Sequence, residues 1–256
     1  MLLALDVGNT NITAGIFKDR RLIRQWRHET WPEIPVAALA RELERAAGAA
    51  RERVDSAVYG SVVPRLDRTL EEAVLKGFGR RPLAVKPSRR LGLGIEVRRP
   101  SEVGVDRLLN ALAAFARVKG PAVVIDFGTA TTFDCVSGRG DYVGGVILPG
   151  PRMSAQALAE RTAKLPLVAV RKPRRVIGRD TVECLQSGLY FGYLGMIDKV
   201  LRLTMGEMRR TERRAPKVLA TGGLSRLFGP DLPRGVALAP QLTLEGLLLA
   251  YERITC

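Results

Sequence analysis

The sequence is poor in several residue types, and each scarcity narrows the chemistry to be expected. A single histidine, His28, occurs among the 256 residues. We interpret His28 as a solvated surface residue because it lies in the charged stretch 24–29, so catalysis by a histidine base is not expected. Aromatic residues make up 5% of the chain, which leaves few platforms on which nucleic-acid bases would stack.

Cysteine and long apolar runs are also scarce. The three cysteines, Cys135, Cys184 and Cys256, lie far apart and show no metal-ligand spacing. An odd and sparse set is typical of reduced thiols and not of a disulfide framework. The apolar N-terminal run is interrupted at Asp6 and follows no basic segment, and no stretch reaches the length of a membrane span. These features predict a cytoplasmic protein without a membrane segment.

Acidic side chains are outnumbered by basic ones. The chain has 41 Lys and Arg against 26 Asp and Glu, a net charge of +15. Clustered cations would favour a nucleic-acid partner because binding releases counterions. The basic residues instead occur in scattered pairs, such as Arg20-Arg21 and Arg209-Arg210, which is typical of a surface charged for solubility. A nucleic-acid partner remains an alternative that the charge alone supports.

Two short apolar segments share one pattern: each ends in an aspartate followed by a glycine turn. The first reads Asp6-Val7-Gly8-Asn9-Thr10, and the second, at residues 126–130, reads Asp-Phe-Gly-Thr-Ala. Each turn precedes a segment that is expected to return as the second strand of a hairpin, at 11–17 and 131–136. A repeat at this long spacing predicts two lobes from a duplicated domain, which we place at 1–117 and 118–256.

The remaining elements follow from apolar spacing and from breakers. We expect strands at 2–7, 54–63, 122–125 and 218–220. We expect helices at 35–51, 66–76, from about 101–104 to 117, 181–205 and 243–251.

The first turn has the chemistry of a phosphate site. An aspartate at the end of a buried strand needs a group that compensates its charge. The turn beside Asp6 offers backbone N–H groups and the Thr10 hydroxyl, and Gly8 leaves room for a ligand. Such a turn binds phosphate oxygens while the aspartate holds Mg²⁺ directly or through water. Taken alone, the turn is equally readable as a plain hairpin with an Asx-type hydrogen bond.

The second turn strengthens the nucleotide interpretation. Two phosphate turns in corresponding halves would hold one nucleoside triphosphate from both sides. A third glycine element, Gly222-Gly223, follows a predicted strand and would let an adenosine lie on bare backbone, although a lone Gly-Gly pair is usually only a turn. The chain has neither a Gly-x-x-x-x-Gly-Lys-Ser/Thr loop nor a Gly-x-Gly-x-x-Gly turn after a strand.

One further cluster, Gly104-Val105-Asp106-Arg107, lies at the expected start of a helix. The positive end of the helix dipole would favour the ionised form of Asp106. Simple helix capping is one interpretation. The other is that Asp106 accepts the proton of a substrate hydroxyl while Arg107 pairs with an anionic group, as phosphoryl transfer requires.

Taken together, these motifs resemble the type III pantothenate kinase family of the acetate and sugar kinase/hexokinase/actin superfamily. The matching blocks run in order along nearly the whole chain: residues 6–11, 104–107 with Asn110, 126–134, 142–150, 177–183 with 186–188, and 242–247 with 251–252. The resemblance implies an α/β fold of two actin-like, ribonuclease-H-like lobes from a duplicated domain. Mixed sheets flanked by helices would form each lobe, with ATP in the cleft between the lobes.

The resemblance also implies an activity and its requirements. The family phosphorylates pantothenate to 4′-phosphopantothenate with ATP, the first step toward coenzyme A. It needs Mg²⁺ and a monovalent cation, K⁺ or NH₄⁺, and works as a homodimer with the active site at the interface. Asp106 would be the proton acceptor, Asp6 would organise Mg²⁺ with the nucleotide, and Asp126 would hold the monovalent cation.

Further residues are assigned position by position. The expected ATP-binding residues are Asp6, Val7, Gly8, Asn9, Thr10, Asn11, Ile12, Thr13, Thr129, Gly222 and Gly223. The expected pantothenate-binding residues are Gly104, Val105, Asp106, Arg107, Val97 and, across the dimer, Thr181.

The chain departs from the family pattern at two positions. Val97 stands where the family usually has a tyrosine, and Thr13 where it often has a lysine. Two other functions are compatible with the same fold: a nucleic-acid-binding accessory regulator of transcription, and an enzyme such as a phosphatase that acts on another acidic substrate.

Overall fold

The computed structural model describes residues 1–31 and 33–255, so Cys256 lies outside the described residues. The chain divides into two compact units. Unit 1 comprises Met1–Gly94, Arg98–Ala113 and the C-terminal segment from Leu242, and unit 2 comprises Ile95–Val97 and Ala114–Gln241. Two units of this kind confirm the expected pair of lobes.

The C-terminal helix α8 (Leu242–Thr255) belongs to unit 1, whereas the division made from the sequence put it in the second lobe. The reason is its packing against α3 (Val105–Val118). A side chain at Gly246 would place its Cβ 2.2 Å from the Leu109 carbonyl oxygen, and the Thr243 hydroxyl donates to Asn110 Oδ1 at 2.8 Å. The chain therefore returns to its first unit at the end.

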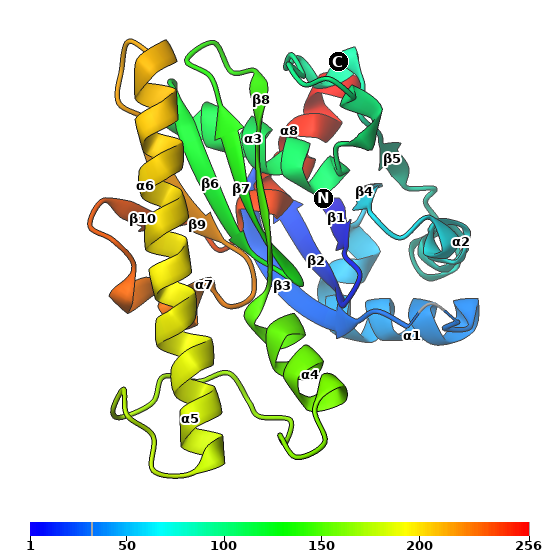
Figure 1. Ribbon diagram of the computed structural model, residues 1–256. Coiled ribbons are helices and arrows are strands. Elements are labelled where there is room, and N and C mark those ends of the chain that lie inside the picture. The colour runs from blue at the N-terminus through cyan, green and yellow to red at the C-terminus, as the bar shows by residue number, and fades with distance from the viewer. Residues whose placement is uncertain (32, 256) are drawn as a thin grey trace. The chain divides into compact units, whose positions relative to one another are not determined.

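Unit 1 is built on a five-stranded mixed sheet (Figure 1). The sheet order is β3-β2-β1-β4-β5, with β1 antiparallel to β2 and parallel to β4. The strands are β1 (Leu2–Val7), β2 (Asn11–Lys18), β3 (Arg21–Glu29), β4 (Ser56–Ser61) and β5 (Leu83–Val85). Helices α1 (Val36–Ala47) and α2 (Pro64–Phe78) complete this unit together with α8 and the N-terminal part of α3.

The two faces of this sheet are covered by different helices. Leu3, Leu5 and Val7 alternate along β1 and share one apolar cluster with residues of α1 and α2. Side chains alternate between faces along a strand, so Asp6 lies on the opposite face. On that face a Cβ at Gly60 would lie 2.9 Å from a Leu109 methyl and 3.4 Å from a Leu247 methyl. Helices α3 and α8 therefore cover the face that carries Asp6.

Unit 2 has the sheet order β10-β9-β6-β7-β8. Read from its other edge, β8-β7-β6-β9-β10, it repeats the order β3-β2-β1-β4-β5 of unit 1. The strands are β6 (Ala122–Phe127), β7 (Ala130–Val136), β8 (Tyr142–Pro149), β9 (Lys217–Thr221) and β10 (Val236–Leu238). The helices that lie wholly in this unit are α4 (Pro151–Arg161), α5 (Thr181–Ser187), α6 (Tyr193–Thr211) and α7 (Ser225–Phe228). Because each strand of unit 1 has a counterpart here, the two sheets confirm the predicted duplication.

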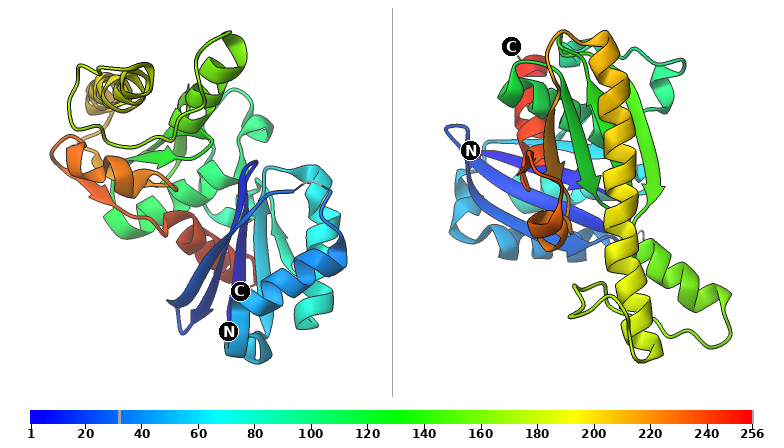
Figure 2. Two further views of the ribbon diagram at one scale, coloured as in Figure 1. Left: turned by 90° about the horizontal axis from the view of Figure 1, so that it is seen from below. Right: turned by 60° about the vertical axis from the view of Figure 1, so that its left-hand side comes forward.

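The long helix α6 runs along one face of the unit 2 sheet (Figure 2). Its Tyr193 packs on an aromatic cluster in which the rings of Phe127 and Phe228 stack at 5.5 Å. Tyr190 stacks on the other side of Phe228 at 5.0 Å. This cluster fixes the end of the central strand β6, where Asp126 lies.

Several predicted elements need correction. The helix expected at 35–51 ends at Ala47 and continues as the 3-10 turn η1 (Gly48–Arg53), because Gly48 adopts a φ of +56°. The single helix expected at 181–205 is α5 and α6, joined by the π-helical turn η4 (Gly188–Gly192). His28 lies in β3 and is only partly solvated, because it forms an ion pair with Glu42.

None of the helices in the described ranges combines the length and the apolar character that a bilayer crossing requires.

Candidate functional site

The first Asp-x-Gly turn joins β1 to β2. Val7 is the last residue of β1 that pairs with β2, opposite Ile12, so four residues, Gly8 to Asn11, form the turn. The Gly8 N–H donates to the Asn11 carbonyl oxygen at 3.0 Å. A Cβ at Gly8 would lie only 3.2 Å from that same oxygen. Asn9 and Thr10 are exposed at the tip.

The second turn joins β6 to β7 and is one residue shorter. Phe127 pairs with Thr131, so only Gly128, Thr129 and Ala130 lie between the paired residues. A Cβ at Gly128 would lie 3.2 Å from the Ala130 carbonyl oxygen, the same close approach as in unit 1. Thr129 is exposed at the tip. The structure thus forms both predicted turns as hairpins with glycine at the tightest point.

Each predicted aspartate stands at the end of a central strand. Asp6 is half-buried and pairs in register with Thr13 on β2 and with Gly60 on β4. Asp126, also half-buried, pairs with Thr132 on β7 and Thr221 on β9. Burial raises the pKa of the neighbouring Tyr193 hydroxyl, and the negative charge of Asp126 adds to this rise. The two carboxylates therefore occupy equivalent positions in the two units.

Gly222 lies against Asp126 within unit 2, a contact that sequence reasoning missed. Its φ is +87°, and a Cβ there would lie 2.3 Å from Asp126 Oδ1 and 2.6 Å from the Phe127 backbone nitrogen. Only glycine fits this conformation and this approach. The sequence signal was the glycine pair after a strand, but the contact joins residues far apart in the chain. Gly223, the second residue of the pair, is exposed.

Asp106 lies in the first turn of α3, where Gly104 makes room for its carboxylate. A Cβ at Gly104 would lie 2.4 Å from Asp106 Oδ1, and the Arg107 N–H donates to that oxygen at 2.9 Å. Burial raises the pKa of Asp106, and the hydrogen bond and positive charge of Arg107 oppose this rise without cancelling it. Any favourable effect of the helix terminus on the ionised form is therefore outweighed by desolvation of the carboxylate.

Unit 1 brings Asp6 and the start of α3 to the same strand end. The Val62 N–H donates to the Val7 carbonyl oxygen at 3.0 Å, which ties the end of β4 to the end of β1. A Cβ at Gly104 would touch a Val62 methyl at 3.6 Å. A Cβ built on Gly60, the register partner of Asp6, would lie 3.4 Å from a Val105 methyl. The start of α3, which carries the predicted proton acceptor, therefore lies at the strand end from which the predicted phosphate turn leaves.

The two other predicted substrate residues lie in unit 2. Val97 lies two residues after Ile95, which pairs with Tyr142 at the edge of the sheet. A Val97 methyl lies 3.8 Å from the position of a Cβ built on Gly144. Thr181 is the exposed first residue of α5. The helix is capped by Asp180, whose carboxylate accepts the Glu183 N–H at 2.8 Å. Thr181 is thus presented on a fixed helix end.

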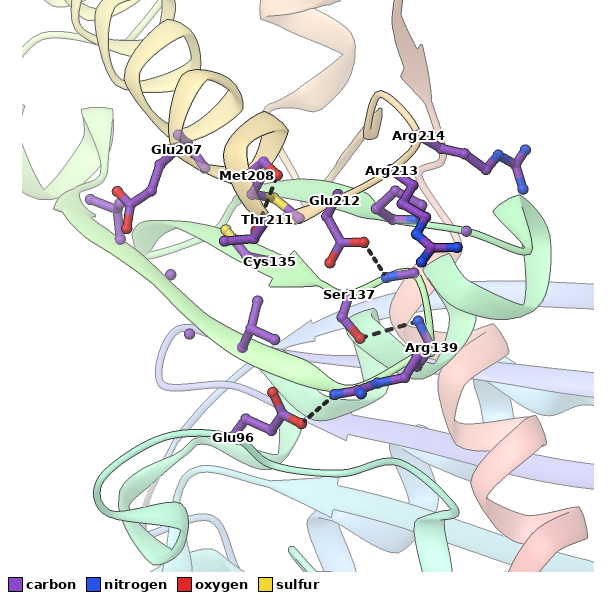
Figure 3. Close-up of a pocket in the computed structure, with 18 residues that line it drawn as sticks. Glu96, Cys135, Ser137, Arg139, Glu207, Met208, Thr211, Glu212, Arg213 and Arg214 are labelled. Atoms are coloured by element: carbon purple, nitrogen blue, oxygen red, sulfur yellow. Dashed lines mark hydrogen bonds and ion pairs between the residues drawn. The ribbon is translucent and has the colours of Figure 1, made fainter.

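A groove of about 970 Å³ lies in unit 2 between the C-terminal half of α6 and the β7–β8 hairpin (Figure 3). Much of its charge is internally paired: Arg139 contacts Glu96 at 3.0 Å, and Glu212 accepts the Gly138 N–H at 3.0 Å. None of the residues predicted from the sequence lines it. The groove is therefore separate from the predicted site residues, although residues 143–146 of the matching block 142–150 line it.

Among the described residues, no group of three or more His, Cys, Asp or Glu side chains is arranged to bind a metal ion. Asp6 and Asp126 are single carboxylates at strand ends, and Asp106 is a single carboxylate at the start of a helix.

The repeated sheet with an Asp-x-Gly turn at each central strand defines a class: the acetate and sugar kinase/hexokinase/actin superfamily. Two solved structures share this fold. A conserved Campylobacter jejuni protein of the Baf transcriptional-activator family has a TM-score of 0.57 at 18% identity, covering 99% of this chain and 100% of its own. The activator of 2-hydroxyisocaproyl-CoA dehydratase from Clostridium difficile, with bound ADPNP, has a TM-score of 0.52 at 13% identity, covering 99% and 95%.

Sequence comparison narrows the class to one family. The type III pantothenate kinase family model matches residues 2–203. Type III pantothenate kinases from Geobacter sulfurreducens and Anaeromyxobacter dehalogenans are 42% and 44% identical, each over 99% of both chains. The enzyme from Moorella thermoacetica is 41% identical over 100% of both. The chain belongs to the type III pantothenate kinase family, a family of kinases.

Proposed function

We propose that this chain transfers the γ-phosphoryl group of ATP to pantothenate, giving 4′-phosphopantothenate, the first step of coenzyme A biosynthesis. One observation carries the proposal beyond family membership: Asp106 adjoins the strand end that carries Asp6 and its phosphate turn. A phosphate turn beside a carboxylate that can accept a hydroxyl proton is the minimum that phosphoryl transfer to an alcohol requires.

Residues Asp6 to Thr13 are proposed to bind the ATP phosphates. The turn is exposed at Asn9 and Thr10, and glycine at its tightest point keeps side chains away from the ligand. Thr129, Gly222 and Gly223 are proposed as further ATP-binding residues. Asp6 would organise the Mg²⁺ that binds together with the nucleotide. When bound, Mg²⁺ would neutralise part of the phosphate charge.

Asp126 is proposed to hold the monovalent cation, K⁺ or NH₄⁺. Its carboxylate is half-buried and lies beside two glycines: Gly222, whose added Cβ would meet Oδ1 at 2.3 Å, and Gly128, at 3.7 Å. Side chains at these positions would fill the space around the carboxylate. A partly desolvated carboxylate with bare backbone around it suits a weakly hydrated cation.

Asp106 is proposed to accept the proton of the pantothenate hydroxyl. Its raised pKa, caused by burial, makes it a stronger base than an exposed aspartate. Arg107 would pair with the pantothenate carboxylate, and Gly104, Val105, Val97 and Thr181 would complete the substrate site. Val97 brings no hydroxyl, so its contribution is apolar contact.

We also propose that the enzyme is a homodimer whose partner subunit supplies Thr181 to the substrate. Apolar side chains are exposed around α4, the segment that follows it and α5: Met153, Leu158, Leu167, Val176, Ile177 and Val182. Leu167 and Ile177 are 68% and 83% exposed. Exposed apolar residues gathered in this way mark an interaction surface. Light scattering of wild type and of Ile177→Glu tests this: the variant should be monomeric and inactive.

The odd and sparse set of three cysteines supports a place in the reducing cytoplasm. The direct test of the activity is an incubation of purified protein with pantothenate, MgATP and K⁺, with mass detection of the product. We expect a phosphorylated pantothenate that depends on all three additions. Phosphate release without a phosphorylated acceptor would support a phosphatase instead, and no turnover across pH and temperature would refute the proposal.

A further inference from the structure

Thr30, the residue that follows β3, contacts both sides of the first phosphate turn. Its N–H donates to the Thr10 carbonyl oxygen at 2.9 Å. Its hydroxyl donates to the Gly8 carbonyl oxygen at 2.7 Å. Thr30 is 8% exposed although its neighbour Trp31 is 52% exposed. A buried residue thus binds two carbonyl groups of a turn whose tip is exposed, one through its backbone N–H and one through its hydroxyl.

The hydroxyl contact is not part of the sheet, whereas the N–H contact continues the antiparallel register of β2 and β3 by one pair. The β2–β3 pairing ends at Asn11 opposite Glu29, so Thr30 lies one residue beyond the last ladder pair. The sheet register needs only the strand backbones, and the Thr30 hydroxyl adds nothing to it. The hydroxyl therefore acts on the turn itself.

Unit 2 has the corresponding contact, made by a different residue. Gly150 follows β8, the counterpart of β3, and its N–H donates to the Thr129 carbonyl oxygen at 3.1 Å. A Cβ at Gly150 would lie 2.1 Å from that oxygen. The backbone contact is therefore common to both units. The hydroxyl contact to the glycine of the turn is made by Thr30 in unit 1, and Gly150 has no side chain with which to make it in unit 2.

We propose that Thr30 is a positioning residue for the nucleotide: it holds the Gly8–Thr10 turn with two carbonyl oxygens engaged. A carbonyl oxygen turned toward a phosphate would repel it, while an N–H would bind it. By binding the Gly8 and Thr10 carbonyls, Thr30 keeps these two oxygens from turning toward the phosphates. The turn is then in its binding shape before ATP arrives, which lowers the cost of ordering it.

This inference rests on the proposed function, in which the turn binds ATP phosphates. Its test is the substitution Thr30→Val, which keeps the shape and the backbone N–H but removes the hydroxyl. We expect the KM for ATP and the Kd for MgADP to rise by about tenfold, the value of one lost hydrogen bond. The KM for pantothenate should stay within about twofold, because the turn does not touch that substrate. Thr30→Ser, which restores the hydroxyl, should recover nucleotide binding.

A matched control is Thr204→Val, which removes a hydroxyl from another buried threonine, in α6. It should leave nucleotide binding unchanged.

Calorimetric titration with MgADP separates the possible failures because it needs no turnover. If wild type binds MgADP and Thr30→Val binds it equally well, the positioning role is refuted while the proposed function stands. If wild type binds no nucleotide, both are refuted. Equal rises in both KM values, or no rescue by serine, would show a purely structural role.

Discussion

The two Asp-x-Gly turns occupy equivalent places in two copies of one sheet, yet their surroundings differ. In unit 1 the end of β4 ties the turn to the start of α3, where Asp106 lies. In unit 2 the end of β9 places Gly222 directly against Asp126. Duplication has preserved the strand order and the position of the aspartate. The contacts around each aspartate have diverged: the first turn leaves a strand end near the proposed proton acceptor, Asp106, whereas in unit 2 the backbone of Gly222 lies against the Asp126 carboxylate.

The sharpest way to test this division is to remove the proton acceptor of unit 1. We expect Asp106→Asn to lower kcat by at least about 100-fold, because the amide cannot accept the hydroxyl proton. Nucleotide binding should remain close to wild type, since Asp106 is assigned to the alcohol and not to the phosphates. Steady-state kinetics and MgADP titration measure the two effects. Near-normal turnover would remove Asp106 from the mechanism.

The same exchange at the two equivalent aspartates tests whether the turns differ in function. Asp6→Asn should raise the Mg²⁺ concentration for half-maximal activity by about tenfold, and Asp126→Asn should do so for K⁺. Titrations of MgCl₂ and KCl at fixed ATP measure both. Each variant serves as the control for the other, because the residue type, the strand position and the half-buried setting are alike. Identical cation profiles in the two variants would contradict the division.

Much of this comparison was predictable from the sequence, because local patterns carry it. Both hairpins, their aspartates and the duplicated sheets follow from apolar runs that end in Asp-x-Gly. Strand β3 did not follow, because Arg21–Glu29 is a mostly polar segment in which only Leu22, Trp26 and His28 are half-buried. It is a strand because β2 offers it a free edge, and no local pattern reports such an edge.

The site was less predictable where it depends on contacts between distant residues. The approach of Gly222 to Asp126 and the hydrogen bonds from Thr30 to the first turn join segments that only the fold brings together. The raised pKa of Asp106 was missed for a similar reason. Position at a helix start is visible in the sequence, whereas burial by neighbouring segments is not.

The close approach of Gly222 gives the next prediction, a smaller effect that is expressed as stability. Gly222 and Gly235 both have positive φ, +87° and +90°, but a Cβ at Gly235 would meet nothing within 4 Å. Gly235→Ala should cost roughly 1–2 kcal/mol of unfolding free energy, from backbone strain alone. Gly222→Ala adds a clash with Asp126 and Phe127, so it should cost roughly 3 kcal/mol or more. Urea denaturation measures both, and equal losses would show that the Asp126 contact is unimportant.

The smallest expected effect concerns the pH dependence of stability at Asp106. Burial raises the folded-state pKa of Asp106 above its ordinary value of 3.8. Below that ordinary value the carboxyl is neutral in both states, and its contribution to stability is intact. As pH rises through the folded-state pKa, the contribution is lost because a charge must be buried. Asp106→Asn stays neutral, so it should raise Tm by a few degrees at about pH 7.5 and leave Tm unchanged at about pH 3.5.

The same exchange at exposed Asp19 should leave Tm nearly unchanged at both pH values. A lower Tm for Asp106→Asn at neutral pH would contradict this prediction. It would show that Arg107 and the helix start stabilise the Asp106 carboxylate more than burial destabilises it.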